Sequence, residues 1–257
     1  MKIVRYADAT TGTPAYGIVE GDMVYAAPGD LFGGLTKGDA VGPLADVKVV
    51  TPLDPGKVLC IGMNYLKHVT EIDPTRKVPT EPVVFMKPTS AIIGPGETIE
   101  IANPQNNTDY EAELVVVVGK TARRVAEADA LDYVLGYTSG NDVSDRVLQA
   151  KDGQWIRAKG FDTYLPLGPS IVTDLDPANT KVESRVNGET RQSDNTDGLI
   201  FNVPFLVSFL SNVMTLDPGD IIMTGTPFGV GPLKDGDVVE VEVGSIGVLS
   251  NPVANRA

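Results

Sequence analysis

Hydrophobic and polar residues follow one another along the chain in patterns that predict many strands and few helices. The clearest stretch is EAELVVVVGK (111–120), where four consecutive valines predict a strand buried on both faces. Two alternating stretches predict hairpins that turn at residues 20–22 and 187–188. Further strands are predicted at 57–65, 82–88, 134–144, 219–225, 237–243 and 247–253, and helices at 66–72, 126–134 and 204–213.

The order of these elements favours an α+β, sheet-rich fold. Strands dominate, and no regular alternation of strand and helix indicates a parallel α/β sheet. The segment TPLDPGK (51–57) carries two prolines and a glycine, which is typical of a linker. We therefore expect a small N-terminal β-rich domain at 1–50 and a larger second domain at 58–257.

Composition narrows the class of protein. Of 257 residues, 27 are Gly and 19 are Pro, more than the roughly 12% of average chains, and this excess fits a fold with many tight turns. The formal net charge of −13 argues against binding to nucleic acid or to an anionic membrane. An anionic substrate would need a local positive centre.

Cysteine content and the apolar stretches indicate a cytoplasmic protein. The one cysteine, Cys60, excludes an intrachain disulfide, and its apolar strand favours a small buried side chain over a nucleophile. The first residues lack an apolar signal segment. The longest apolar stretch, LIFNVPFLVSFLSNVM (199–214), contains too many polar residues to cross a bilayer.

Three acidic residues precede the valine run at every second position. Asp109, Glu111 and Glu113 share one face of the predicted strand, and burying them unpaired would cost several kcal/mol each. A solvated strand edge is the common alternative, but the buried valines favour a hard cation held by carboxylate oxygens. Asp142 lies in a turn where the segment 134–144 passes from strand to loop, and it is either a further ligand or the cap of the helix that starts near Ser144; beside the glutamates we favour the ligand.

The only histidine stands three residues before a glutamate. His68 and Glu71 would face together on a short helix, and a carboxylate beside an imidazole orients it as a general base. A chance ion pair on a surface helix is the alternative. Because no G-x-S-x-G motif is present, activated water is the more economical nucleophile.

Three further positions are weaker signals. Lys159 precedes a glycine and a strand, where a lysine normally faces solvent. Gln149 lies on the helix predicted after Asp142 and could donate a hydrogen bond. The Gly-rich stretch MTGTPFGVG (223–231) offers hydroxyl and backbone N–H groups to an oxyanion, or is only a loop.

Six segments together resemble one enzyme family. IGMNYLKHVTE, FMKPTSAIIGPG, DYEAELVVVVGK, GYTSGNDVSDRVLQ, KGFDTYLPLGP and MTGTPFGVG occur in the order and spacing typical of the fumarylacetoacetate hydrolase superfamily, over roughly residues 58–257. The resemblance implies a mixed β-sheet roll. It also implies an enzyme that cleaves C–C bonds, decarboxylates or tautomerises small 2-oxo acids with Mg²⁺ or Mn²⁺, and a homodimer.

The resemblance also assigns roles to individual residues. Glu111, Glu113 and Asp142 would be the metal ligands, and His68 with Glu71 the pair that activates water. A divalent cation would then be the positive centre that the acidic strand requires. Lys159 would act in catalysis and, with Gln149 and Thr226, would hold the oxygens of the substrate; Asp109 is not clearly assigned and would lie behind the ligands or at the surface.

Two departures from the family pattern concern the distal end of the substrate. Met63 stands where an arginine is common, and Val147 stands where an aspartate commonly follows Arg146. The segment 68–79 carries charges and two prolines, and we expect it to act as a mobile lid from which Arg76 or Lys77 could replace the missing cation. Alternative functions are an isomerase of unsaturated 2-hydroxy dioic acids and a non-catalytic Ca²⁺-binding β module.

Overall fold

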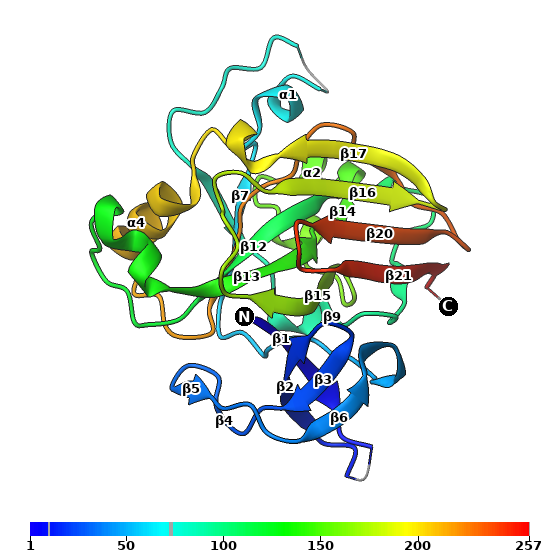
Figure 1. Cartoon of the computed structure of the whole chain (residues 1–257). Helices are drawn as coiled ribbons and strands as arrows, with labels where there is room; N and C mark the ends of the chain where they lie inside the picture. The colour runs from blue at the N-terminus through cyan, green and yellow to red at the C-terminus, as the bar shows by residue number, and fades with distance from the viewer. Residues whose placement is uncertain (10, 72–73, 257) are drawn as a thin grey trace.

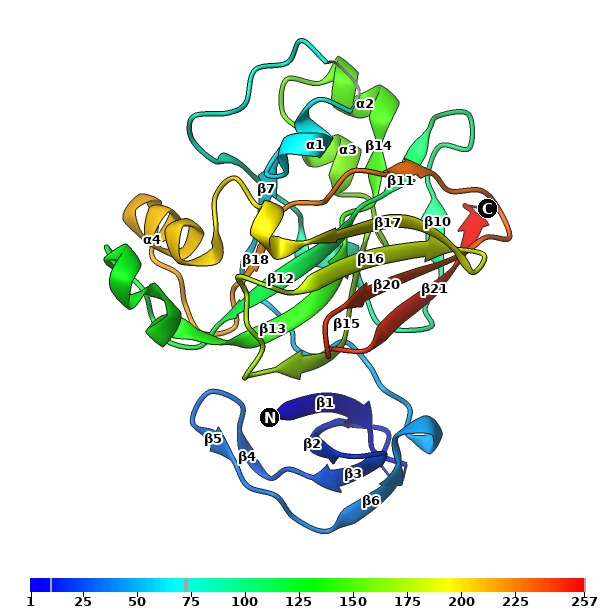
Figure 2. The ribbon, with the colours of Figure 1, turned by 45° about the horizontal axis from the view of Figure 1, so that its top comes forward.

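The computed structural model describes residues 1–9, 11–71 and 74–256 and confirms the predicted α+β, sheet-rich class. Within the described residues, one large mixed sheet forms the centre of the molecule, and a smaller sheet packs beside it (Figures 1 and 2). Most neighbouring strands are antiparallel, while the pairs β18–β7, β15–β9 and β10–β21 are parallel.

The large sheet runs through ten strands from one edge to the other, with an eleventh, β9, paired to β15. In spatial order they are β6 (Ala40–Pro43), β3 (Met23–Ala26), β2 (Pro14–Glu20), β1 (Lys2–Ala7), β15 (Leu165–Val172), β13 (Val134–Asn141), β12 (Ala112–Val118), β18 (Ile221–Met223), β7 (Val58–Gly62) and β8 (Val83–Met86), and β9 is Ile92–Ile93.

The remaining strands form one sheet of five and two small ones. The five are β10 (Ile99–Ile101), β21 (Val248–Asn255), β20 (Val238–Val243), β16 (Lys181–Val186) and β17 (Glu189–Asn195). The small sheets are β14 (Ser144–Asp145), β11 (Thr108–Tyr110) and β19 (Gly231–Pro232), and β4 (Gly29–Asp30) with β5 (Gly34–Leu35).

Helices are short and few in the part of the chain that the structure describes. The α-helices are α1 (Leu66–Val69), α2 (Arg146–Lys151), α3 (Ile156–Lys159) and α4 (Val203–Val213), and the 3-10 helices are η1 (Leu44–Asp46), η2 (Thr89–Ala91), η3 (Glu127–Tyr133) and η4 (Thr196–Gly198). None is long and apolar enough to cross a membrane, over the residues searched.

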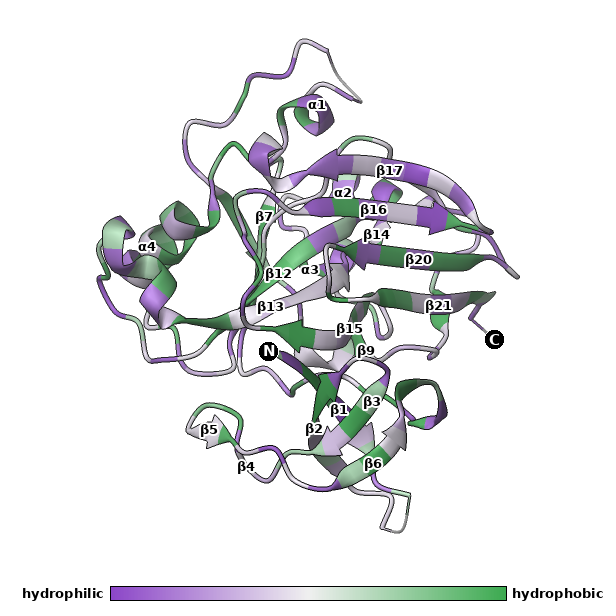
Figure 3. Cartoon of the chain, in the orientation of Figure 1, coloured by the Kyte–Doolittle hydropathy of each residue, from purple (hydrophilic) through white to green (hydrophobic). Residues whose placement is uncertain are grey.

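Strand β12 is buried on both faces, as its valine run predicts. Leu114 and Val116 enter a core shared with α4 and with the inner faces of β16 and β20. Val115 and Val117 enter a second core on the opposite face, with Leu167 of β15. The outer strand of the smaller sheet, β17, carries mostly hydrophilic residues (Figure 3). The site described below is therefore built on a strand that packing holds on each side.

The first strands of the chain are not separate from the large sheet. β1 pairs antiparallel with β15, and Ile3 lies in the same core as Val115. The expected boundary near residue 50 stays a prediction. Both predicted hairpins form, and Asn187 and Gly188 adopt the positive φ angles of 53° and 78° that a tight two-residue turn requires.

Of the helices predicted at 66–72, 126–134 and 204–213, the first two differ from expectation. The segment predicted as a helix at 126–134 is the 3-10 helix η3, and α1 ends at Val69 although the pattern continues to residue 72, which lies outside the described residues. The third prediction is accurate: α4 starts at Val203, where the side chain of Asn202 accepts a hydrogen bond from the backbone N–H of Phe205.

Asn64 generates a prediction about stability. Its buried side chain donates to the carbonyls of Phe201 (2.9 Å) and Thr224 (2.7 Å) and accepts from the N–H of Phe201 (2.8 Å). Asn64→Ala leaves these buried groups unpaired and should lower the free energy of unfolding by about 2–4 kcal/mol. Chemical denaturation measures this; Asn212→Ala, at an exposed amide of α4, should change it by less than about 0.5 kcal/mol.

Candidate active site

Glu111, Glu113 and Asp142 come together at one end of two neighbouring strands. Glu113 lies in β12, Glu111 directly precedes this strand, and Asp142 directly follows β13. The strands are antiparallel with Ala112 opposite Asn141, so the start of one meets the end of the other. One carboxylate oxygen from each acid lies within 4.8 Å of the others, and all three side chains are buried.

Hydrogen bonds to the backbone fix this arrangement. The N–H of Asp142 donates to the carbonyl of Glu111 (2.9 Å), and the N–H of Glu111 donates to the side-chain oxygen of Asn141 (2.9 Å). Since Ala112 points to the opposite face, the two glutamates lie on one side of the chain. The three acids are thus held by strand geometry rather than by a flexible loop.

Two buried lysines contact this cluster. The ammonium of Lys159, at the end of α3, lies 2.9 Å from Oε2 of Glu111 and 2.5 Å from Oδ2 of Asp142. The ammonium of Lys87, which follows β8, lies 2.6 Å from Oδ1 of Asp142 and donates to the carbonyl of Val143. Both oxygens of Asp142 therefore have a cationic partner.

Arg146 supplies a third positive charge. Its Nη2 lies 2.6 Å from Oε1 of Glu111, and its Nε donates to Oδ2 of Asp109 (2.7 Å). Asp109 is buried but does not join the three acids, so it lies behind them and balances the charge of Arg146. This places the acid that the resemblance left unassigned.

The two glutamates are in opposite electrostatic environments. Burial alone would raise the pKa of Glu111, but the charges of Lys159 and Arg146 outweigh it and lower that pKa well below its usual range. The pKa of Glu113 is raised well above its usual range, first by burial and then by the negative charges of Asp142 and Glu111. A hydrogen bond from the N–H of Gly225 (2.8 Å) opposes this rise without cancelling it.

These residues fit a hard divalent cation. Mg²⁺ and Mn²⁺ prefer oxygen ligands, and three carboxylates offer oxygens that face one another. Burial and the negative charges of Asp142 and Glu111 disfavour the ionised form of Glu113, which raises its pKa. A cation among the three acids would supply the missing compensation.

His68 and Glu71 form the predicted pair. Nδ1 of His68 lies 2.7 Å from Oε2 of Glu71, and Oε1 of Glu71 accepts from the N–H of Gly229 (2.9 Å). The ring of His68 lines the same cavity as Glu111 and Glu113. Residues 72–73 of the expected lid lie outside the described residues, and closure of that segment stays a prediction.

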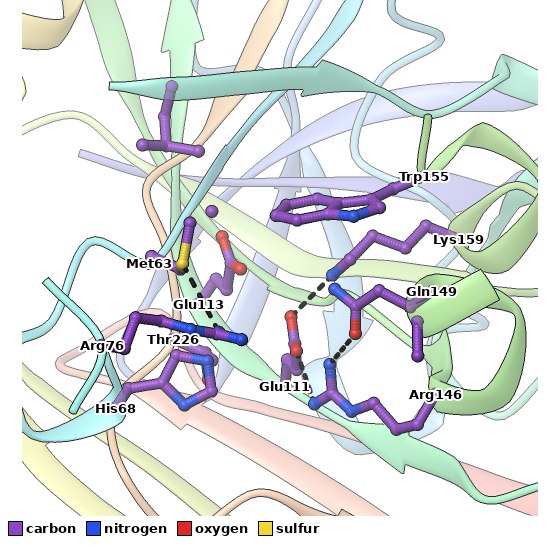
Figure 4. A pocket seen from close by; sticks show the side chains of 13 residues that line it. Met63, His68, Arg76, Glu111, Glu113, Arg146, Gln149, Trp155, Lys159 and Thr226 are labelled. Carbon is purple, nitrogen blue, oxygen red and sulfur yellow. Dashed lines mark hydrogen bonds and ion pairs between the residues drawn. The ribbon is translucent and has the colours of Figure 1, made fainter. Parts of the chain in front are cut away.

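A cavity of about 430 Å³ joins the acidic cluster to the histidine (Figure 4). All three residues predicted to bind the substrate line this cavity: Gln149, Lys159 and Thr226. Gln149, on α2, accepts from Arg146 through its side-chain oxygen (2.8 Å), so its amide N–H groups remain to donate to a ligand. The cavity therefore brings carboxylates, an imidazole, an ammonium and an amide into one space.

Thr226 is less suited to donate to a substrate than the resemblance implies. Its hydroxyl donates to the carbonyl of Ala112 (2.9 Å) and accepts from the side chain of Gln192 (2.7 Å). Because a hydroxyl has one hydrogen, the donor of Thr226 is already used within the protein. Its side chain lines the cavity and holds the strand that carries the glutamates.

Apolar side chains complete the lining of the cavity. Met63 adopts a left-handed backbone with φ of 56°, and its sulfur accepts a hydrogen bond from Arg76 at 3.6 Å (Figure 4). The indole of Trp155 lies against Gly62, where an added Cβ would be 2.6 Å from a ring carbon. The guanidinium of Arg76 is thus present beside the position where the family commonly has arginine.

Two structural alternatives considered for individual residues are now distinguished. The cap of α2 is Asp145, whose side chain accepts from the N–H of Leu148 (3.0 Å), and not Asp142. Cys60 is fully buried in β7, and burial raises the pKa of its thiol well above the usual range. The buried thiol of Cys60 is therefore not suited to act as a nucleophile.

Sequence reasoning missed several residues of the site. Lys87 ends an ordinary apolar strand, so no pattern distinguishes it from a solvent-facing lysine. Arg146 was noted only as part of a motif, although it contacts both Glu111 and Gln149. Gln192 approaches Ala112 from the other sheet across 80 residues of chain, a contact that no local periodicity can indicate.

Comparisons with known proteins show similarity to one family over nearly the whole chain. The family model of the fumarylacetoacetate hydrolase C-terminal domain matches residues 57–254, and the model "Rv2993c-like, N-terminal" matches residues 1–52. A protein of Archaeoglobus fulgidus is 53% identical over 81% of this chain and 83% of its own. The mitochondrial oxaloacetate tautomerase fahd2 of Xenopus laevis is 42% identical over 81% of this chain and 69% of its own.

Solved structures show the same fold over the full length. The structure of 5-carboxymethyl-2-hydroxymuconate delta-isomerase from Mycobacterium smegmatis has a TM-score of 0.89 and 43% identity, with all of both chains covered. Maleylpyruvate hydrolase from Sphingobium sp. SYK-6, solved with manganese(II) and pyruvate, has a TM-score of 0.82 and 30% identity, again over both whole chains. Together with the family model over residues 57–254, these matches show that the chain belongs to the fumarylacetoacetate hydrolase superfamily.

Proposed function

We propose that this protein is an enzyme that uses Mg²⁺ or Mn²⁺ to cleave a C–C bond in a small 2-oxo acid. The reaction would be hydrolysis of an acylpyruvate or decarboxylation of an oxaloacetate-type acid, each through an enolate. One observation carries the proposal: a single cavity is lined by Glu111 and Glu113 of the carboxylate cluster, by His68, which pairs with Glu71, and by Lys159. The small-molecule substrate, rather than a nucleic acid or membrane, fits a cavity of about 430 Å³.

Glu111, Glu113 and Asp142 would hold the cation. When bound there, it would act as a Lewis acid that polarises the keto group of the substrate and lowers the energy of the enolate. The 2-oxo acid itself carries a carboxylate, and Lys159 and Arg146 place positive charge beside it. The amide N–H groups of Gln149 would orient its oxygens.

His68 is arranged to move a proton. Glu71 accepts from Nδ1 and is itself held by the N–H of Gly229, so the imidazole keeps one orientation and Nε2 is the basic nitrogen. In hydrolysis, Nε2 takes a proton from water, whose oxygen attacks the distal carbonyl. The C–C bond then breaks, its electron pair forms the enolate of pyruvate, and His68 returns the proton to the enolate carbon.

Tautomerisation or isomerisation is a second candidate. Relatives from Xenopus laevis and Rattus norvegicus, 42% and 41% identical, are named oxaloacetate tautomerases, and a full-length structural neighbour is named an isomerase. Such a reaction needs only the proton transfers at the enolate carbon and oxygen, with no attack by water. The non-catalytic Ca²⁺-binding module is disfavoured because the carboxylate cluster opens onto a cavity lined by His68 and Lys159.

Arg76 suggests a substrate with a second anionic group. It lines the cavity on the side opposite Lys159 and lies against Met63 (Figure 4). A carboxylate at the distal end of the substrate could displace the weak thioether contact and pair with the guanidinium. We therefore favour dicarboxylic 2-oxo acids as substrates. We also propose that the protein acts in the cytoplasm as a homodimer.

The first prediction from the proposed function concerns pH and the cation. Because a proton and a cation compete for Glu113, affinity for Mn²⁺ should fall as pH decreases through the raised pKa of this residue. The loss of Mn²⁺ affinity should begin at a pH above the range in which ordinary glutamates titrate. Calorimetry between about pH 5 and about pH 8 measures it. Glu113→Gln should bind at least about tenfold more weakly and lose this dependence; affinity equal to that of the parent would contradict the assignment.

The second prediction concerns His68. His68→Ala should reduce hydrolysis of acylpyruvates by about 10²–10⁴-fold because the general base is lost. Its Mn²⁺ affinity should stay nearly unchanged, since among the described residues the side chain of His68 bonds to Glu71 and not to the three acids. Lys67→Ala, one position earlier on α1 and exposed, is the matched control and should keep full activity.

Assays with a panel of acylpyruvates and oxaloacetate, in Mg²⁺, Mn²⁺ or EDTA, separate the reactions. Activity of His68→Ala on oxaloacetate decarboxylation but not on acylpyruvates would support the role of water activation. Full acylpyruvate hydrolysis by this variant would refute the His68–Glu71 assignment. Turnover confined to tautomerisation would favour the second candidate.

The third prediction is the homodimer. Edge strand β8 presents Val84 and Met86 with exposed fractions of 37% and 40%, an apolar edge that needs cover. Sedimentation equilibrium at micromolar concentration should give twice the chain mass of 27.2 kDa. A mass of one chain would refute the homodimer. Met86→Lys places a charge on this edge, and this variant should dissociate toward monomer if β8 lies in the interface.

A further inference from the structure

The backbone between the two cluster glutamates has an unusual set of partners. Strand β18 pairs with β12 only from Val115 to Val117, so Ala112 has no strand neighbour on that side. Side chains, rather than a neighbouring strand, bind the backbone N–H and carbonyl of Ala112. The N–H of Ala112 donates to Oε1 of Gln192 (3.0 Å), and its carbonyl accepts from the hydroxyl of Thr226 (2.9 Å).

Gln192 is fully buried in β17 and uses its whole hydrogen-bonding capacity. Oε1 accepts from the N–H of Ala112 and from the hydroxyl of Ser184 (2.9 Å). Nε2 donates to the hydroxyl of Thr226 (2.7 Å) and to the carbonyl of Pro227 (2.7 Å). Two acceptor and two donor positions are thus all occupied.

These partners leave the amide one orientation. The N–H of Ala112 can only donate and the carbonyl of Pro227 can only accept, so Oε1 faces the first and Nε2 the second. The hydroxyl of Thr226 links the two ends, because it accepts from Gln192 and donates to Ala112. The result is a closed ring of hydrogen bonds around the residue that separates Glu111 from Glu113.

We propose that Gln192 is a positioning residue that sets the spacing of the Glu111 and Glu113 carboxylates for a divalent cation. It does so through the ring with Thr226 and Ala112, and so makes the smaller sheet part of the metal site. The inference rests on the proposed function, since it assumes that these carboxylates bind the cation. Ligand groups must be held to within about 0.5 Å, and this backbone is where such control is needed.

Gln192→Leu removes all four hydrogen bonds at similar side-chain size. It leaves the N–H of Ala112 and the carbonyl of Pro227 buried and unpaired, and the chain can relieve this only by moving. The ligand glutamates on either side of Ala112 would move with it. We expect Mn²⁺ to bind about 10–100-fold more weakly in calorimetry, the range for loss of a residue that supports metal ligands, and the electron paramagnetic resonance spectrum of bound Mn²⁺ to change.

A control separates this role from general stability. Ser170→Ala removes a hydroxyl that is also fully buried and donates to the carbonyl of Ile246 (2.6 Å), away from the cavity. It should lower the midpoint of thermal unfolding while the Mn²⁺ affinity of the folded protein stays unchanged. Equal loss of affinity in Ser170→Ala and Gln192→Leu would overturn the proposal.

Thr226 provides a second route to the same answer if Gln192→Leu does not fold. Thr226→Val removes the hydroxyl of the ring and Thr226→Ser retains it, so only the valine variant should bind Mn²⁺ more weakly. Where both single variants fold, the double variant should lose less affinity than the two losses combined, since one ring is broken in each case. Parental affinity in Gln192→Leu, or equal affinity in the two Thr226 variants, would overturn the inference alone; no Mn²⁺ binding by the parent would overturn the metal site with it.

Discussion

Crowding of buried negative charge is the constraint on which this structure depends. Three carboxylates approach within 4.8 Å of one another in the interior, where each uncompensated charge costs several kcal/mol. Lys87, Lys159 and Arg146 are therefore drawn into the protein from three separate elements. Asp109 adds a fourth acid behind them, so these four acids outnumber the three cations by one, a deficit that a divalent ion would remove.

The strands around the three acids are rigid and hold these acids together. β12 is packed on both faces, and its neighbour β13 brings Asp142 to the same end. Side-chain amides of Asn141 and Gln192 bind the backbone on either side of Glu111, where regular strand pairing stops. The acids cannot spread apart to reduce their repulsion, and the free energy of that repulsion is available to bind a cation.

Local sequence patterns predicted the strands, turns and helices that depend on neighbouring residues. The buried strand at 112–118, the hairpin at Asn187 and the helix at 203–213 follow from runs of valine, from a turn pair that tolerates positive φ, and from an amphipathic period. Glu111 and Glu113 were found because like charges at alternate positions demand an explanation, and Asp142 because a turn exposes it at the end of another strand. The 3-10 helix η3 was missed because helix type depends on how its few residues dock onto α4.

Long-range contacts could not be predicted in the same way. Lys87 meets Asp142 across 55 positions and Gln192 meets Ala112 across 80, and each depends on strand order rather than on neighbouring residues. The family resemblance supplied roles for residues within its motifs. It could not show that the hydroxyl of Thr226 is already committed to Ala112.

The pairing of β1 with β15 has a consequence for how the chain holds together. The first strands are attached to the main sheet by backbone hydrogen bonds as well as by residues 51–57, and Ile3 is part of the core that also contains Val115. A single proteolytic cut in the connecting segment would therefore leave two fragments bound to each other as a nicked protein. Loss of the first fragment would uncover an unpaired edge of β15, and the remaining body would be prone to aggregate through it.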